Sequence, residues 1–273
     1  MSNPSNVAVI VPFHKGSLSR DESISLRHLN HFLGPYEKFL VIPENLSLDL
    51  QGFQKMVFPE KLFRSVQSYN YLLSKRDFYL TFKRYEYILI YQLDSLVFSD
   101  QLLHWCSQGY DYIGAPWLKE FKLPWTEGKD LVGNGGFSLR KVETFLEVLD
   151  TYEKSPRRFI PILGRLLQRV PHWIRRGRNA QARRKILSDF KKHPFGVLNW
   201  LERGNCNGED MFWSIMVPKF SPKFKKAPPR KALSFSFEFN PRLSFQMNHK
   251  ALPFGCHAWA KYDRAFWEPY LLS

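Results

Sequence analysis

Short, unbroken apolar runs alternate along the chain with segments whose apolar residues recur at helical spacing. Residues 7–13 and 87–91 are the clearest runs, and such runs are typical of strands buried on both faces of a parallel sheet. In residues 21–33 and 141–152 the apolar positions fall on one face of a helix. This alternation predicts an α/β fold, a Rossmann-like, mostly parallel sheet flanked by helices. The same pattern predicts further strands at 38–42, 55–58, 112–115, 136–139 and 233–239, and further helices at 65–74, 77–85, 101–107 and 208–216.

The pattern breaks at residues 154–199, which we interpret as a basic, amphipathic helical insertion in a single domain spanning residues 1–273. The chain has a formal net charge of +15, and 13 of its Lys and Arg residues lie in residues 154–194 against one acidic residue, Asp189. Residues 159–170 are mainly apolar, and Trp173 follows them. Such a segment can lie in the headgroup layer of an anionic membrane, where each cation contributes ~1 kcal/mol. A nucleic-acid patch and a solvated basic loop are the alternatives.

Composition narrows the class of protein. A hydrophobic fraction of 44% and an aromatic fraction of 16% exclude an intrinsically disordered chain. The three cysteines have no metal-ligand spacing and no even count for a disulfide framework, which favours reduced thiols in a cytosolic protein. No secretory signal is recognisable, and no apolar run approaches the ~20 residues of a membrane span. We therefore expect a soluble or peripheral cytoplasmic protein.

Polar residues follow two of the predicted strands at their carboxyl ends, where open α/β sheets bind ligands. Asp94 and Ser95 come directly after the run that ends at Leu93. A carboxylate there can hold Mg²⁺ or Mn²⁺ against a diphosphate, although a turn or capping aspartate is the alternative. At the end of the first strand, Pro12, Phe13 and His14 could form a wall and a polar contact for a nucleoside, or simply begin a loop.

Two further segments carry candidate chemistry. Residues 133–136 contain three glycines, whose backbone is free to adopt positive φ and to let a ligand approach closely. Asn134, Gly135 and Gly136 are therefore candidate donor-binding residues, and a glycine-rich hairpin is the alternative. Asp210, beside Glu209, is a candidate general base for an acceptor hydroxyl. Both acids could instead, or in addition, stabilise a helix N-terminus.

In this order, the motifs resemble those of glycosyltransferases with the GT-A fold. The segments that carry the resemblance are Val11-Pro12-Phe13-His14, Leu93-Asp94-Ser95-Leu96, Gly133-Asn134-Gly135-Gly136-Phe137-Ser138-Leu139-Arg140, Gly208-Glu209-Asp210 and Gly255-Cys256-His257. They cover most of the chain outside the insertion. The nearest whole-chain likeness is to an uncharacterised group of bacterial and viral GT-A-like proteins.

The resemblance implies roles for particular residues. Asp94 stands where such enzymes carry an Asp-x-Asp metal motif, and His257 resembles the C-terminal histidine that completes the metal site. Glu209 and Asp210 resemble the catalytic pair whose aspartate is the base in inverting members. Position 96 is Leu, so the second aspartate of the metal motif is absent. The resemblance thus implies one Mn²⁺ or Mg²⁺ ion held by Asp94, His257 and the donor phosphates.

The sequence therefore predicts an inverting glycosyltransferase of polysaccharide biosynthesis that uses a UDP-, GDP- or dTDP-sugar. We expect a lipid-linked or surface glycan as acceptor, and a cytoplasmic enzyme peripheral to the inner membrane that binds anionic lipid through residues 154–194. Two other classes of protein remain as alternatives. One is a basic nucleic-acid-binding module, although nucleic acid is a less favoured partner than an anionic membrane. The other is a catalytically inactive nucleotide-sugar-binding protein.

Overall fold

The computed structural model describes residues 6–123, 126, 128–154 and 208–272. The predicted insertion, residues 154–199, lies outside these residues apart from Lys154, as does Cys206; Cys106 and Cys256 are buried free thiols. No helix in the described part of the chain is long and apolar enough to cross a membrane.

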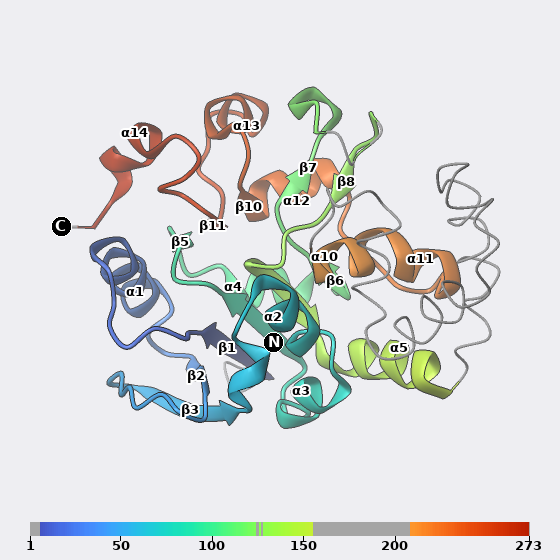
Figure 1. Cartoon of the computed structure of the whole chain (residues 1–273). Coiled ribbons are helices and arrows are strands. Elements are labelled where there is room, and N and C mark those ends of the chain that lie inside the picture. The colour runs from blue at the N-terminus through green and yellow to red at the C-terminus, as the bar shows by residue number, and fades with distance from the viewer. Residues whose placement is uncertain (1–5, 124–125, 127, 155–207, 273) are drawn as a thin grey trace, which may run out of the picture.

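A six-stranded sheet forms the centre of the molecule, in the order β3-β2-β1-β4-β9-β6 (Figure 1). The four strands β3, β2, β1 and β4 are parallel to one another, whereas β9 runs antiparallel to both β4 and β6. The predicted α/β class with a mostly parallel sheet is therefore confirmed. The bounds of the six strands are Val7–Pro12 (β1), Glu37–Pro43 (β2), Phe53–Phe58 (β3), Tyr87–Tyr91 (β4), Tyr112–Ile113 (β6) and Phe137–Lys141 (β9).

The two longest apolar runs form the centre of this sheet. Every residue of β4, and every residue of β1 except Pro12, is buried. The strands pair directly, with Val7 opposite Tyr87 and Ile10 opposite Ile90. A strand in this position has helices on both faces, so both sets of alternating side chains must be apolar. The carboxyl ends of β1 and β4 consequently meet at one edge of the sheet.

Helices cover the sheet on both sides. The connections β1–β2 and β3–β4 cross the sheet in opposite directions, and right-handed crossovers then place their helices on opposite faces. Figure 1 shows α3 and α5 together and away from α1. Helix α1 begins with a capping box, in which Ser19 accepts from the Glu22 amide and the Glu22 carboxylate accepts from the Ser19 amide. The bounds are Arg20–Phe32 (α1), Val66–Leu72 (α2), Arg76–Thr81 (α3), Leu102–Ser107 (α4) and Val142–Lys154 (α5), with short 3₁₀ turns at Glu60–Leu62 and Lys119–Phe121.

The C-terminal part of the chain adds short elements at the edge where β4 ends. Strand β5 pairs with β11, which pairs with β10, and β7 pairs with β8. The predicted helix over 208–216 is present as α10, a π-helical turn over Phe212–Met216 and α11. The other bounds are Leu96–Val97 (β5), Pro116–Trp117 (β7), Leu131–Val132 (β8), Glu209–Met211 (α10), Val217–Phe220 (α11), Pro229–Phe235 (α12), Ser236–Phe237 (β10), Pro241–Met247 (α13), Gly255–Cys256 (β11), Arg264–Trp267 (α14) and a 3₁₀ turn at Glu268–Tyr270.

The strand predicted over 233–239 is wrong over most of its length. Residues up to Phe235 belong to helix α12, and only Ser236–Phe237 form a strand. Pro229 occupies the start of this helix, where its fixed φ suits the first turn and its missing N–H costs nothing. The alternation of apolar and polar residues that indicated a strand instead places Ala232, Leu233 and Phe235 in the core.

Candidate active site

The pairing of β5 with β11 brings together two residues that are distant in the sequence. Cys256 pairs with Leu96, so His257 lies beside Asp94, and the Trp259 amide donates to the Asp94 carbonyl over 3.1 Å. Asp94 Oδ1 is 3.3 Å from His257 Nε2. The Asp94 side chain is 52% exposed, whereas that of His257 is 15% exposed. The carboxylate thus faces solvent while the imidazole is held beneath it.

Polar side chains from three other segments surround the imidazole. Gln92 Oε1 is 3.1 Å from Nε2, and Nδ1 is 2.8 Å from Asn134 Nδ2 and 3.0 Å from Glu238 Oε1. Burial lowers the pKa of His257, but Asp94 and Glu238 raise it and the net pKa is well above the ordinary value. For Asp94, burial raises the pKa, yet the charge and hydrogen bond of His257 outweigh it and the net pKa is lowered.

Gln92 and Glu238 were not among the residues proposed from the sequence. Gln92 extends β4 and donates through Nε2 to the Tyr69 hydroxyl over 3.0 Å, so its carbonyl oxygen faces His257. Glu238 follows β10, the neighbour of β11. A glutamate within the apolar segment Phe237-Glu238-Phe239 was the signal that could have identified it, because an acidic side chain in such surroundings needs a polar partner.

The glycine-rich segment reaches the site in a different way from the one predicted. The positive φ belongs to Asn134 (67°), and none of the three glycines adopts one. The Asn134 Oδ1 atom accepts from the Phe137 amide over 2.9 Å, which directs its Nδ2 at His257. A Cβ atom on Gly136 would lie 2.1 Å from His257 Nε2, and one on Gly135 would lie 2.3 Å from Glu209 Oε1. These glycines therefore make room for side chains of the protein.

A buried ion pair lies beneath the same segment. Arg140 and Glu209 are 0% and 2% exposed, and their charged atoms are 2.6 Å apart. Arg140 also donates to the Tyr79 hydroxyl, the Ser138 hydroxyl and the Gly135 carbonyl. Burial disfavours the charged guanidinium, but the opposing effect of Glu209 dominates and the pKa of Arg140 is raised. Glu209 is thus engaged inside the protein.

Asp210 is the next residue along and is only partly buried. Its Oδ1 atom accepts from the Met211 amide over 2.8 Å, and Gly208 leaves it space, since a Cβ there would lie 1.9 Å from this oxygen. Burial and the negative charges of Glu209 and Glu238 raise the pKa of Asp210 to about 7. A carboxylate with such a pKa can accept a proton near neutral pH.

The remaining predicted residues do not contact His257. The Ser95 hydroxyl is buried and donates to the Gly136 carbonyl over 3.4 Å, so it faces the protein interior. Phe13 is buried and its amide donates to Val41, whereas His14 is exposed and Pro12 partly exposed at the end of β1. Of these residues, His14 is free to meet a ligand from the solvent.

The donor set suits a divalent cation with few protein ligands. Asp94 Oδ1 and Gln92 Oε1 lie 3.3 Å and 3.1 Å from His257 Nε2. Such O and N donors suit Mn²⁺ and Mg²⁺ once His257 has released its proton, because only a neutral imidazole has a lone pair for a metal. Within the described residues there is no cluster of three or more His, Cys, Asp or Glu side chains that could hold a metal ion. A cation at Asp94 and His257 therefore needs phosphate oxygens or water to complete its coordination.

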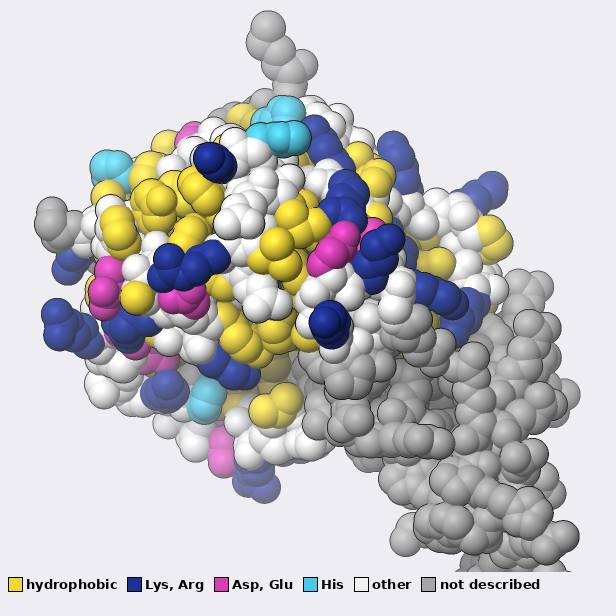
Figure 2. Space-filling view, turned by 90° about the horizontal axis from the view of Figure 1, so that it is seen from above, with side chains coloured by type: hydrophobic (Ala, Val, Ile, Leu, Met, Phe, Trp, Pro, Cys, Tyr) yellow, Lys and Arg dark blue, Asp and Glu magenta, His cyan; other side chains and the backbone are white. Residues whose placement is uncertain are grey.

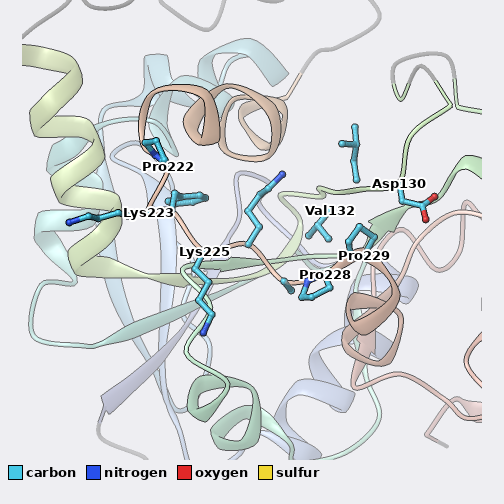
Figure 3. Close-up of a pocket in the computed structure, with 11 residues that line it drawn as sticks. Asp130, Val132, Pro222, Lys223, Lys225, Pro228 and Pro229 are labelled. Atoms are coloured by element: carbon cyan, nitrogen blue, oxygen red, sulfur yellow. The ribbon is translucent and has the colours of Figure 1, made fainter.

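A cavity of about 510 Å³ lies elsewhere, between β8 and the segment 222–229 (Figure 3). None of the carboxylates around His257 lines it, and neither does Asp210. Although three lysines border it, Figure 3 shows Lys223 and Lys225 pointing away from Pro228 and Pro229. The cavity is distinct from the polar cluster at the sheet edge.

Comparison with solved structures finds glycosyltransferases. The mannosyltransferase Ktr4p from S. cerevisiae has a TM-score of 0.38 and 8% identity over 54% of this chain and 59% of its own. The glycosyltransferase GlyE of Streptococcus pneumoniae TIGR4 has a TM-score of 0.44 and 12% identity. The match covers 96% of this chain and 59% of GlyE. The galactosyltransferase LgtC in complex with donor and acceptor sugar analogs has a TM-score of 0.42 and 10% identity. The match covers 92% of this chain and 86% of LgtC. The chain thus spans about three fifths of Ktr4p and of GlyE.

Comparison of the sequence with curated proteins finds no match. A family profile matches residues 52–257, three quarters of the chain, and its description is "Protein of unknown function (DUF5672)". The matched range contains Gln92, Asp94, Asn134, Asp210 and His257, and it excludes Pro12, Phe13 and His14. The chain belongs to the DUF5672 family.

Proposed function

We propose that the protein is a glycosyltransferase that moves a sugar from a nucleotide-sugar donor to a hydroxyl acceptor. One observation carries the proposal. A solvent-facing carboxylate beside an imidazole, Asp94 and His257, lies at the carboxyl end of β4. The glycine-rich segment contacts both His257 and Glu209, and Glu209 precedes a second carboxylate, Asp210, with a pKa of about 7. The first pair suits a diphosphate with its cation, and the second carboxylate suits a general base.

In the proposed reaction Asp210 takes the proton of the acceptor hydroxyl. The acceptor oxygen then forms a bond to the anomeric carbon of the donor sugar. The bond from that carbon to the diphosphate oxygen breaks on the opposite face, and its electron pair leaves with the nucleoside diphosphate, so the configuration inverts. Asp94 and His257 would hold Mn²⁺ or Mg²⁺, which when bound neutralises charge on the leaving diphosphate.

Donor binding tests the function directly. We expect one of a panel of UDP-, GDP- and dTDP-sugars to bind, measured by isothermal titration calorimetry with Mn²⁺. EDTA should weaken this binding, because two protein ligands hold a divalent ion poorly without phosphate oxygens. Asp94→Ala should remove both the sensitivity to EDTA and most of the affinity. The matched control is Asp49→Ala, which removes a carboxylate that is 82% exposed and pairs with Lys55.

The possible outcomes separate the alternatives. Affinity no tighter than millimolar for every donor, with and without Mn²⁺, contradicts the proposal. Binding of nucleic acid that weakens steeply with salt would then favour the basic nucleic-acid-binding module. Donor hydrolysis without acceptor argues against an inactive binding protein. Donor affinity that EDTA leaves unchanged would assign Asp94 a direct hydrogen bond to the donor instead of a metal.

We further propose a lipid-linked or surface glycan as acceptor and a location at the cytoplasmic face of the inner membrane. The charge of residues 154–194 supports this, because a concentrated positive charge repels itself unless an anionic partner is present. The aliphatic run 159–170 with Trp173 suits a lipid interface. Figure 2 shows that Lys and Arg side chains on the described face lie among hydrophobic and some acidic ones.

Flotation with liposomes tests the membrane proposal. We expect binding to vesicles that contain anionic lipid, and weaker binding at high salt because surface charges are then screened. Binding should disappear when a short linker replaces residues 154–194. Purely zwitterionic vesicles are the control. Unchanged flotation of the deletion variant, or no flotation of the intact protein, would contradict the proposal and favour a soluble acceptor.

A further inference from the structure

One guanidinium group links the two halves of the proposed site. Arg140 lies on β9, between β4 and β6, and is fully buried. One of its terminal nitrogens donates to the Gly135 carbonyl over 3.2 Å and to Glu209 over 2.6 Å. Its other donors bind the Tyr79 hydroxyl over 2.8 Å and the Ser138 hydroxyl over 3.0 Å. The group therefore has a fixed orientation.

The two partners of that nitrogen belong to different parts of the site. Gly135 follows Asn134, whose side chain contacts His257, on the side of the site that is proposed to bind the nucleotide-sugar donor. Glu209 precedes Asp210, the proposed base, on α10. Glu209 also packs against the Cα atom of Gly135, where even a methyl group would collide with its carboxylate. The distance between the donor side and the base is therefore fixed through Arg140 and Glu209.

Stability alone is a poor explanation for this arrangement. Removing two charges from water costs several kcal/mol for each ion, and apolar side chains of similar volume often replace a buried ion pair without loss of stability. Moreover, the second oxygen of Glu209, Oε2, is buried and has no hydrogen-bond partner in the described part of the chain. An unmade hydrogen bond of this kind costs about 1–3 kcal/mol.

We propose that Arg140 and Glu209 are positioning residues, which hold Asp210 at a fixed place beside the glycine-rich segment and supply the negative charge next to it. This inference rests on the proposed function. The groups that act on the Asp210 carboxylate are Glu209 and Glu238, which favour its protonated form, and Arg140 and the Met211 amide, which favour its ionised form. Burial favours the protonated form as well.

Glu209→Gln tests the electrostatic part. Glutamine keeps the shape and an oxygen toward Arg140 but removes the negative charge beside Asp210. The midpoint of the acidic limb of turnover should move to lower pH by about one unit or more, because a nearby like charge raises a carboxyl pKa by such amounts. Titration of the Asp210 carboxyl carbon, followed by ¹³C NMR, should move in the same direction. A purely structural role would move neither, so unchanged midpoints would overturn the inference.

The paired variant Arg140→Met with Glu209→Leu tests the positional part. We expect a melting temperature within a few degrees of the wild type, since both charges leave together. Turnover should fall by about 100-fold, which is the contribution of a well-placed base, and donor affinity should stay within about threefold. Wild-type turnover in this folded variant would overturn the inference. A folded variant that loses donor binding as much as turnover would also overturn it, because the pair would then serve the donor side.

These measurements also separate the inference from the proposed function. If the wild type transfers no sugar from any donor, the proposed function fails, but the Asp210 titration still decides the electrostatic part. If Glu209→Gln does not fold, the paired variant replaces it in the titration. Its Asp210 carboxyl should also titrate at lower pH, since Glu209 acts more strongly on Asp210 than Arg140 does.

Discussion

Replacing Asp210 with asparagine should lower turnover by about 100-fold or more, because general-base catalysis contributes factors of this size. Asparagine has nearly the same shape and can still accept from the Met211 amide, which lies 2.8 Å from Oδ1. Donor affinity should therefore stay within about threefold, since Asp94 and His257 are unchanged. Steady-state kinetics and calorimetry on the same preparations measure both quantities. Asp49→Asn, at an exposed carboxylate, is the matched control.

The pH dependence gives this prediction a second readout. A general base must be ionised, and burial with its acidic neighbours raises the pKa of Asp210 to about 7. Wild-type turnover should therefore rise with pH through about 7. Well below that pH, turnover should fall about tenfold for each unit by which the pH is lowered. The residual activity of Asp210→Asn should lack this acidic limb. Full activity in the variant would remove Asp210 as the base, and a product of retained configuration would contradict the inverting mechanism.

Gly136→Ala should cost both stability and donor affinity. The added methyl group would lie 2.1 Å from His257 Nε2 and 2.7 Å from Gln92 Oε1, and neither group has room to move without losing its partners. Overpacking of this kind costs typically about 1–3 kcal/mol. Displacing the imidazole from Asp94 should weaken donor binding by about tenfold or more, equivalent to about 1.4 kcal/mol. Denaturant unfolding and titration with the donor measure the two effects.

Gly16→Ala is the control for this substitution. Gly16 is exposed in the loop after β1, its φ is not positive, and a Cβ atom there would meet nothing within 4 Å. Its effect on stability should be within about 0.5 kcal/mol. If Gly136→Ala binds the donor as well as Gly16→Ala does, His257 has no part in donor binding. The metal assignment would then fail as well.

The fold was largely predictable because its central strands are buried on both faces. Residues 7–13 and 87–91 carry no polar side chain apart from tyrosine hydroxyls, which is typical of strands buried in a parallel sheet. The segment 233–239 misled because its alternation fits both a strand and the buried positions of a short helix, and Pro229 decided for the helix. The start of a helix is set by nearby residues such as Pro229, whereas the strand that a short segment pairs with is set by residues far away in the sequence.

The predicted site was incomplete for a related reason. Asp94 follows an obvious strand and could be found from local sequence. Glu238 is locally recognisable only as an acidic residue in an apolar segment. Its place beside His257, like that of Gln92, depends on which strand lies next to β11. The glycines drew attention correctly, but the sequence could not show that Glu209 and His257 fill the space beside them. Arg140 was part of a recognised motif, yet its ion pair spans a large distance in sequence.

The pairing of β5 with β11 has a consequence for synthesis on the ribosome. Asp94 and Asn134 emerge early, but the strand that delivers His257 begins only at Gly255, long after the last strand of the central sheet. The same late segment holds the Asp94 backbone through the Trp259 amide. A nascent or truncated chain that ends before this strand lacks the imidazole that the proposed function assigns to the cation and its diphosphate. The proposed donor site would therefore be complete only after the whole central sheet has been translated.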